Sequence, residues 1–207
     1  MDCAKIGRLI LQLRKEKNLT QREVAEQLHV SNKTVSKWEC GLGCPDVSLW
    51  EGLAALLGAD LLTLLQGELS PNLPDTGKLE RLRFYCCPVC GNILTSTGSA
   101  SVACCGRQLS ALLPPAAALP GHSVSVGEVE DEYYIQPEHE MRREHYLLFA
   151  AFVCGDCLWL RRMYPEQSPA FRMPRLRPQG LLYLYCTQHG LMKYRFSAAC
   201  PRLLPSE

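Results

Sequence analysis

Twelve cysteines and five histidines are the side chains of this 207-residue chain best suited to metal or redox chemistry. Two cysteine pairs, Cys87 with Cys90 and Cys104 with Cys105, lie on either side of a Gly- and Ser-containing stretch. Two thiolate pairs joined by a short β-hairpin can close a tetrahedral four-sulfur site around zinc or iron. We expect a reducing cytoplasm, where clustered cysteines bind metal more often than they form disulfides. The spacing therefore predicts a four-cysteine metal site.

A second group of possible ligands lies nearer the C-terminus, where four of the five histidines fall between residues 122 and 189. Imidazole nitrogens suit first-row metals, and a thiolate adds electron donation that tunes a redox potential. A single histidine near a strand is more often packed or solvated than a ligand, so composition alone leaves both interpretations open. The candidate ligands are His122, His139, His145, Cys186 and His189.

Composition excludes several other classes of protein. The chain has 22 basic and 21 acidic residues, which excludes a polybasic tail or an acidic solvating chain. A hydrophobic content of 47% is too high for general disorder. The N-terminus lacks the pattern of a signal peptide, and the apolar tract from Leu53 to Leu65 is too short to span a bilayer. We expect a cytoplasmic protein with no membrane segment.

The first seventy residues have the pattern of short helices. Apolar residues recur at helical spacing from Ile6 to Leu13, which predicts a first helix. Thr20 and Glu23 form a capping box, the signature of a helix N-terminus. We expect four further helices, each starting after one of the N-cap residues Thr20, Ser31, Asp46 and Asp60.

The segment LTQREVAEQLHVSNKTVSKWECG closely resembles the helix-turn-helix of the lambda-repressor/Cro-like (XRE-type) family, whose five-helix domain fits residues 5–67. This resemblance implies a DNA-binding domain that works as a homodimer on double-stranded DNA, because one domain presents one recognition helix. The alternative is a helical bundle for protein contacts. By resemblance the DNA contacts are Gln21, Asn32, Lys33, Thr34, Ser36 and Lys37, with Thr34 on the DNA backbone.

The four-cysteine segment resembles the desulforedoxin-like (rubredoxin-like) domain that begins desulfoferrodoxins. It shares an aromatic residue before the first pair, Cys-Gly-Asn after it, and the adjacent Cys-Cys-Gly. The resemblance implies an iron ligand set of Cys87, Cys90, Cys104 and Cys105, with Cys86 as an extra thiol. The sequence does not separate iron from a structural zinc.

The remaining chain has the alternating and apolar runs of a small β-sandwich. It resembles the catalytic domain of the superoxide reductases desulfoferrodoxin and neelaredoxin, which is an immunoglobulin-like sandwich. That family holds iron with four histidines and an axial cysteine, leaving one position open for superoxide. The matching features are the six-residue spacing of His139 and His145, the Cys186-Thr-Gln-His189-Gly sequence, and the place of His122.

One departure from that family bears on chemistry. The family carries Glu-Lys directly before its first histidine, where the lysine attracts superoxide, and Pro120 and Gly121 stand there in this chain. Loss of that cation weakens both attraction of the anion and stabilisation of peroxide charge. Substitutes to consider are Arg142, Arg143 and Arg195.

These elements predict a multidomain α + β chain: a helix-turn-helix domain over residues 1–69, a linker over 70–80, a metal knuckle over 81–115 and a β-sandwich over 116–207. Cys154 and Cys157 flank a Gly-Asp turn. They either form a reversible disulfide as a redox pair or are ordinary strand residues. Oxidation of Cys40 and Cys44 would disturb the recognition helix, although incidental thiols are the better interpretation. Cys3 and Cys200 are given no role.

Three functions compete at this point. The first is a transcription regulator whose iron module senses superoxide, redox state or iron. The second is a superoxide reductase-type oxidoreductase, weakened by the missing Glu-Lys pair, with an appended DNA-binding domain. The third is a DNA-binding protein whose metals only fold or dimerise the chain.

Overall fold

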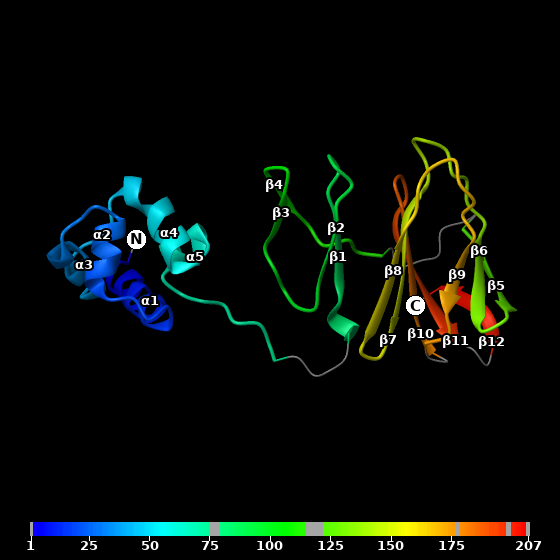
Figure 1. The fold of residues 1–207 in the computed structure, drawn as a ribbon, viewed down its shortest axis with the longest axis horizontal. Coiled ribbons are helices and arrows are strands. Elements are labelled where there is room, and N and C mark those ends of the chain that lie inside the picture. Colours follow the sequence, from blue (N-terminus) through cyan, green and yellow to red (C-terminus); the bar gives the residue numbers. More distant parts are fainter. Residues whose placement is uncertain (1, 75–78, 115–121, 177–178, 198–199, 206–207) are drawn as a thin grey trace. The chain divides into compact units, whose positions relative to one another are not determined.

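The computed structural model describes residues 2–74, 79–114, 122–176, 179–197 and 200–205. The chain divides into two compact units, Met1–Pro71 and Asn72–Glu207. The first unit is helical and the second is built of strands (Figure 1). Among the described residues, no helix is long and apolar enough to cross a membrane.

The helical unit begins each main helix at a side chain that caps it. Asp2, Ser31 and Asp60 each accept backbone N–H hydrogen bonds in the first turn that follows, and Thr20 and Glu23 form the predicted capping box. The elements are α1 (Cys3–Glu16), α2 (Gln21–Gln27), α3 (Asn32–Glu39), η1 (Val47–Leu49), α4 (Trp50–Leu57) and α5 (Leu61–Gln66). Asp46 caps the 3-10 turn η1, which continues into α4, instead of capping the α-helix directly.

The core of this unit forms where α1 and α3 pack closely. Gly7 makes that approach possible, because a Cβ atom built on it would lie 2.0 Å from the carbonyl oxygen of Trp38. The buried apolar side chains around it include Ile10, Val24, Val35 and Leu53, each at most 1% exposed. The core therefore fixes the orientation of α3 against α1.

Cys3 and Cys44 form a disulfide across this unit, which corrects the expectation that Cys3 has no role. Their Cα atoms lie 5.3 Å apart although 41 positions separate them in sequence. The bond joins the first residue of α1 to the loop between α3 and η1. Spacing in the sequence could not indicate this pair, because only the packing of α1 on α3 brings the two residues together.

The second unit begins with two small antiparallel hairpins. After η2 (Leu79–Arg81), β1 (Arg83–Cys86) pairs with β2 (Ile93–Ser96), and β3 (Val102–Cys104) pairs with β4 (Arg107–Leu109). Side chains of β1 alternate between two faces, as strand geometry requires. Phe84 and Cys86 face a cluster shared with the larger sheet, whereas Tyr85 and the following Cys87 face a small core of the hairpins.

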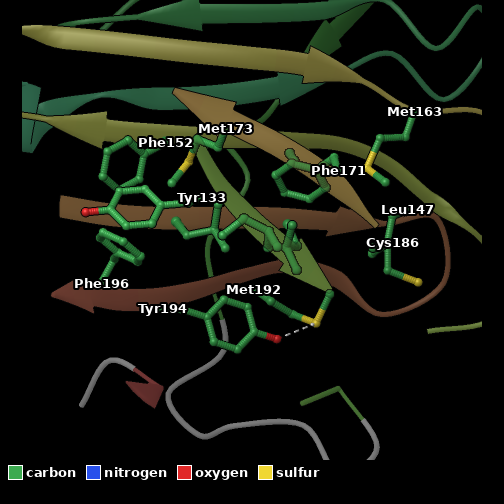
Figure 2. Packing of buried hydrophobic residues seen from close by; sticks show 14 of the residues in the cluster. Tyr133, Leu147, Phe152, Met163, Phe171, Met173, Cys186, Met192, Tyr194 and Phe196 are labelled. Carbon is green, nitrogen blue, oxygen red and sulfur yellow. Dashed lines mark hydrogen bonds between the residues drawn. The ribbon is translucent and has the colours of Figure 1, made fainter. Parts of the chain in front are cut away.

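The larger sheet has eight strands in the order β8-β7-β10-β11-β12-β5-β6-β9, and each neighbouring pair is antiparallel. The strands are β5 (Val124–Val129), β6 (Glu132–Pro137), β7 (Leu147–Cys154), β8 (Cys157–Arg162), β9 (Phe171–Pro174), β10 (Gln179–Cys186), β11 (Gly190–Ser197) and β12 (Cys200–Pro205). Inner side chains of β6 and β9 pack against those of β7, β10 and β11 (Figure 2). The unit thus has two layers of strands around one apolar core.

All eight residues of β7 are buried, because both faces of the strand are covered. One face, with Phe152, points into the core between the layers. The other face, with Phe149, lies under the first hairpins, where the rings of Phe84 and Phe149 are 5.4 Å apart. The division into a separate knuckle over 81–115 and a sandwich over 116–207 stays a prediction.

Candidate metal centres and nucleic-acid interface

Five side chains from three segments of the β-rich unit converge on one point. Each offers one ligand atom, and these atoms all lie within 4.8 Å of one another. They are the side chains predicted from the sequence: His122, His139, His145, Cys186 and His189.

Cys186 is fully buried at the end of β10, beside the core (Figure 2). The register between β10 and β7 shifts at this residue, and such bulges re-aim side chains near sites. A three-residue turn then leads to Gly190, whose φ of 81° suits glycine. The backbone N–H groups of Gln188 and His189 both donate to Cys186 Sγ at 3.4 Å, which fixes the position of the sulfur.

The imidazoles present their ring nitrogens to a common centre. His189 Nδ1 lies 2.9 Å from His122 Nε2, 3.2 Å from His145 Nε2 and 3.5 Å from Cys186 Sγ. His139 Nε2 is buried and has no hydrogen-bond partner within the part of the chain that the structure describes. A buried nitrogen in that condition costs free energy unless a partner such as a metal ion binds it.

Charge at this cluster also favours a metal cation. Burial lowers the pKa of His139 and that of His189, and the neighbouring imidazoles lower both further. The two rings are therefore neutral at pH 7 and hold lone pairs ready for coordination. Imidazole nitrogens together with one cysteine sulfur suit several first-row metals, iron among them, so these residues fit an iron ion.

Glu140 supports one of these histidines, which the sequence analysis did not foresee. Its Oε1 hydrogen-bonds with His145 Nδ1, and its Oε2 pairs with Arg142 Nε at 2.9 Å. The hydrogen bond to His145 is the main cause that lowers the pKa of Glu140. The carbonyl oxygen of Glu140 also contacts His139 Nδ1. A carboxylate between two candidate ligands was the signal available in the sequence.

The three arginines considered as substitutes for the missing cation lie in different places. Arg142 reaches the histidine cluster through Glu140, whereas Arg143 pairs with Glu166 at 3.0 Å. Arg195 lies near the far end of β11 and pairs in register with a residue of β12. Pro120 and Gly121 lie outside the described residues.

The four predicted cysteines of the hairpins form the second cluster, again with ligand atoms within 4.8 Å. Cys105 and Gly106 close the β3–β4 hairpin with φ values of 51° and 71°, as a type I′ turn requires. Backbone N–H groups of Cys90 and Val89 lower the pKa of Cys87 to about 6. Crowding by the sulfurs of Cys90, Cys87 and Cys104 raises the pKa of Cys105 to about 12.

The opposite directions of these pKa shifts reflect the crowding of the four sulfurs, which a bound cation would relieve. Asn92 Nδ2 donates to Cys104 Sγ at 3.7 Å, a contact the sequence analysis missed. Cys86 does not belong to the cluster, and its half-buried thiol faces Tyr185, with burial raising the pKa of Cys86. The donor set suits zinc or iron.

The other predicted thiols have clear positions. Cys154 and Cys157 are directly opposite each other at the β7–β8 hairpin. Cys40 is exposed at the C-terminus of α3. The side chain of Cys200 lies outside the described residues.

The predicted recognition helix α3 presents polar side chains to solvent. Asn32, Lys33 and Lys37 are exposed, while Thr34 Oγ1 lies 2.8 Å from Ser31 Oγ and Ser36 is half-buried. Gln21 at the start of α2 donates from Nε2 to Glu39 Oε2 at 2.8 Å. This contact fixes the side chain of Gln21 beside α3.

Comparison with known proteins assigns these two regions separately. Residues 10–64 match the helix-turn-helix family model. The chain is 39% identical over 72 residues to the HTH-type transcriptional activator BcrR of Enterococcus faecalis, and this match covers 35% of each chain. The chain thus spans about a third of the length of that relative.

The β-rich region is similar to proteins of a different kind. It is 24% identical over 119 residues to a desulfoferrodoxin of Syntrophotalea carbinolica, a match that covers 54% of this chain and 94% of that protein. A solved structure, the superoxide reductase from Treponema pallidum, aligns with 54% of this chain and 95% of its own at 20% identity and a TM-score of 0.46. By its sequence matches the chain joins a helix-turn-helix region to a region similar to desulfoferrodoxin.

Proposed function

We propose that this chain is a sequence-specific DNA-binding transcription regulator whose desulfoferrodoxin-like module binds iron and senses superoxide, redox state or iron. The observation that carries the proposal is the presence, in one chain, of a helix-turn-helix region and an assembled cluster of four imidazoles and a buried cysteine sulfur. A regulator needs both a part that reads DNA and a part whose state changes with a signal.

In this proposal His122, His139, His145, His189 and Cys186 hold one iron, and Cys87, Cys90, Cys104 and Cys105 hold a second iron or a zinc. Iron at the first site supplies a one-electron redox change. The chain's own groups prepare that site: desolvation lowers the pKa of His139 and that of His189, which favours the neutral rings, and two backbone N–H groups donate to the sulfur of Cys186. The two strand layers belong to an immunoglobulin-like sandwich.

The DNA-binding part acts through the exposed face of α3. Asn32 and Ser36 contact base edges, and Lys33 and Lys37 contact phosphates or bases. Gln21 is a further DNA contact, and Thr34 contacts the DNA backbone. The protein binds DNA as a homodimer, because one short recognition helix offers too little contact for a specific site. It does so in the cytoplasm.

The test combines metal analysis with DNA binding. The full chain is purified without oxygen, its iron and zinc are counted, and its operator is selected from a random pool of DNA duplexes. Affinity is then measured for reduced, oxidised and metal-free protein at one salt concentration. We expect the three affinities to differ. Equal affinities contradict sensing, and zinc without iron contradicts every redox role.

Superoxide reduction is the second candidate function, favoured by the complete set of four imidazoles and one buried cysteine. In that case the helix-turn-helix region either localises the enzyme on DNA or lets the protein regulate its own synthesis. Superoxide consumption by the iron-loaded chain, lost in Cys186→Ser, supports this function. Consumption that persists unchanged in Cys186→Ser contradicts it.

A further inference from the structure

The loop between His139 and His145 holds a carboxylate and a cation in series behind one candidate ligand. Glu140 Oε1 contacts His145 Nδ1, the ring nitrogen that faces away from the cluster, while His145 Nε2 faces His189 Nδ1 at 3.2 Å. Glu140 Oε2 pairs with Arg142 Nε at 2.9 Å. The order of contacts is therefore guanidinium, carboxylate, imidazole, cluster.

The backbone of the same loop fixes this arrangement. Arg142 and His145 form an isolated antiparallel bridge, with N–H···O distances of 2.9 Å and 3.1 Å in the two directions. Thr187 Oγ1 accepts from the N–H of Tyr146 at 3.2 Å, which ties the loop to the turn that carries His189. These bonds fix the backbone at Arg142, His145 and Tyr146, next to Glu140 in the same loop.

We propose that Glu140 is a positioning residue for His145, and that Arg142 sets how strongly this carboxylate acts on the cluster. A carboxylate that accepts the Nδ1–H of a metal-binding imidazole fixes the tautomer and makes the ring a stronger donor through Nε2. A stronger donor stabilises ferric over ferrous iron and lowers the reduction potential. Arg142 draws charge from the carboxylate and so opposes that effect.

This inference rests on the proposed iron site. It predicts that two substitutions shift the reduction potential of the iron in opposite directions. Glu140→Gln removes the negative charge and raises the reduction potential of iron at the histidine cluster. Arg142→Gln leaves the carboxylate without its counter-ion and lowers that potential. A variant that merely loosens the loop does not produce shifts in both directions. In the double variant the effect of Arg142→Gln shrinks, because it acts through Glu140.

The same loop offers matched controls. Arg143 pairs with Glu166 at 3.0 Å, and both side chains are more than 60% exposed. Within the described chain neither side chain contacts a histidine, so Arg143→Gln and Glu166→Gln remove the same charges nearby without touching the series of contacts.

The experiment uses the full chain loaded with Fe(II) without oxygen. The midpoint potential is followed through the thiolate-to-iron absorption band, and Fe(II) affinity is measured by competition with a chelator. We expect Glu140→Gln to weaken Fe(II) binding by about 10–100-fold and to raise the potential, with both controls unchanged. An unshifted potential in Glu140→Gln, or shifts of one sign in both variants, overturns the inference.

These outcomes are separate from those of the proposed function. If the affinity for DNA is the same in every metal state, the proposed sensing function is contradicted. The reduction potentials of the Glu140 and Arg142 variants still test the present inference. Failure of the unmodified chain to bind iron at the cluster contradicts both proposals.

Discussion

Arg14 and Glu39 form a two-point ion pair inside the helical unit, with Nε–Oε1 at 2.5 Å and Nη2–Oε2 at 3.0 Å. Their side chains are only 11% and 3% exposed. Glu39 also accepts from Gln21, and Arg14 donates to the carbonyl oxygen of Leu19. One buried carboxylate therefore joins α1, α2 and the end of α3.

Removing one partner of this pair is expected to destabilise the helical unit strongly. Glu39→Gln leaves the Arg14 charge without its counter-charge, which costs about 3–5 kcal/mol in comparable buried pairs. Urea unfolding of the full chain, followed by its helical circular dichroism, measures the change. The control is Arg22→Ala, since Arg22 pairs with Glu26 on the exposed surface and such pairs contribute less than about 1 kcal/mol. Similar losses in the two variants would contradict the prediction.

DNA binding is expected to depend on the exposed side chains of α3. Lys33→Ala and Lys37→Ala each remove a phosphate contact and reduce the slope of log affinity against log salt by about 1. Asn32→Ala reduces discrimination between the selected operator and a mismatched site by about 1–3 kcal/mol. Fluorescence anisotropy with a labelled duplex measures both. Lys15→Ala on α1 is the control. An equal loss of affinity in that variant would show that DNA is bound by general electrostatic attraction and not by the exposed face of α3.

The bond between Cys3 and Cys44 is expected to stabilise the helical unit by roughly 2–4 kcal/mol, because it closes a long loop in the unfolded chain. Cys3→Ser and Cys44→Ser then unfold at a lower urea concentration than the oxidised wild type. A dithiol reductant lowers the urea midpoint of the wild type to that of the variants. Cys40→Ser leaves the midpoint unchanged. A wild type with equal midpoints with and without reductant contradicts a stabilising bond.

Acid is expected to weaken the helical unit through its capping carboxylates. A backbone hydrogen bond from Thr20 lowers the pKa of Glu23, and backbone bonds from Lys5 and Ser48 lower those of Asp2 and Asp46. As the pH falls below about 4.5, the unfolded chain takes up protons before the folded one, so the free energy of unfolding falls. Above that pH these carboxylates contribute fully. Urea unfolding measured from neutral to acid pH checks this, and Glu23→Gln has a shallower dependence.

Local features of this chain were predictable from its sequence. The caps at Thr20, Ser31 and Asp60 depend on neighbours two or three positions away, so their residue types are enough to indicate them. The helix-turn-helix region is confirmed by the family match over residues 10–64. The cysteine pairs of the hairpins are local for the same reason. That these side chains bind metal stays a prediction.

The five ligands of the histidine cluster were predicted through the resemblance to superoxide reductases, and the structure brings them together. Other contacts between distant residues were not predictable. Cys3 meets Cys44, and Arg14 meets Glu39, only after α1 has packed on α3. Glu140 is close in sequence to His145, yet its role depends on a loop that turns both side chains to the same side. Such contacts depend on tertiary packing, which residue types and spacing do not specify.

The burial of both faces of β7 makes the small hairpins a cover as well as a candidate metal site. Phe84 shields Phe149 and Tyr183, whose rings would otherwise meet water. If the four-cysteine metal holds the hairpins in shape, its loss uncovers an aromatic patch on a sheet, the kind of surface through which proteins self-associate. Under metal starvation, the first effect on this chain would then be loss of solubility, before any change in its redox chemistry.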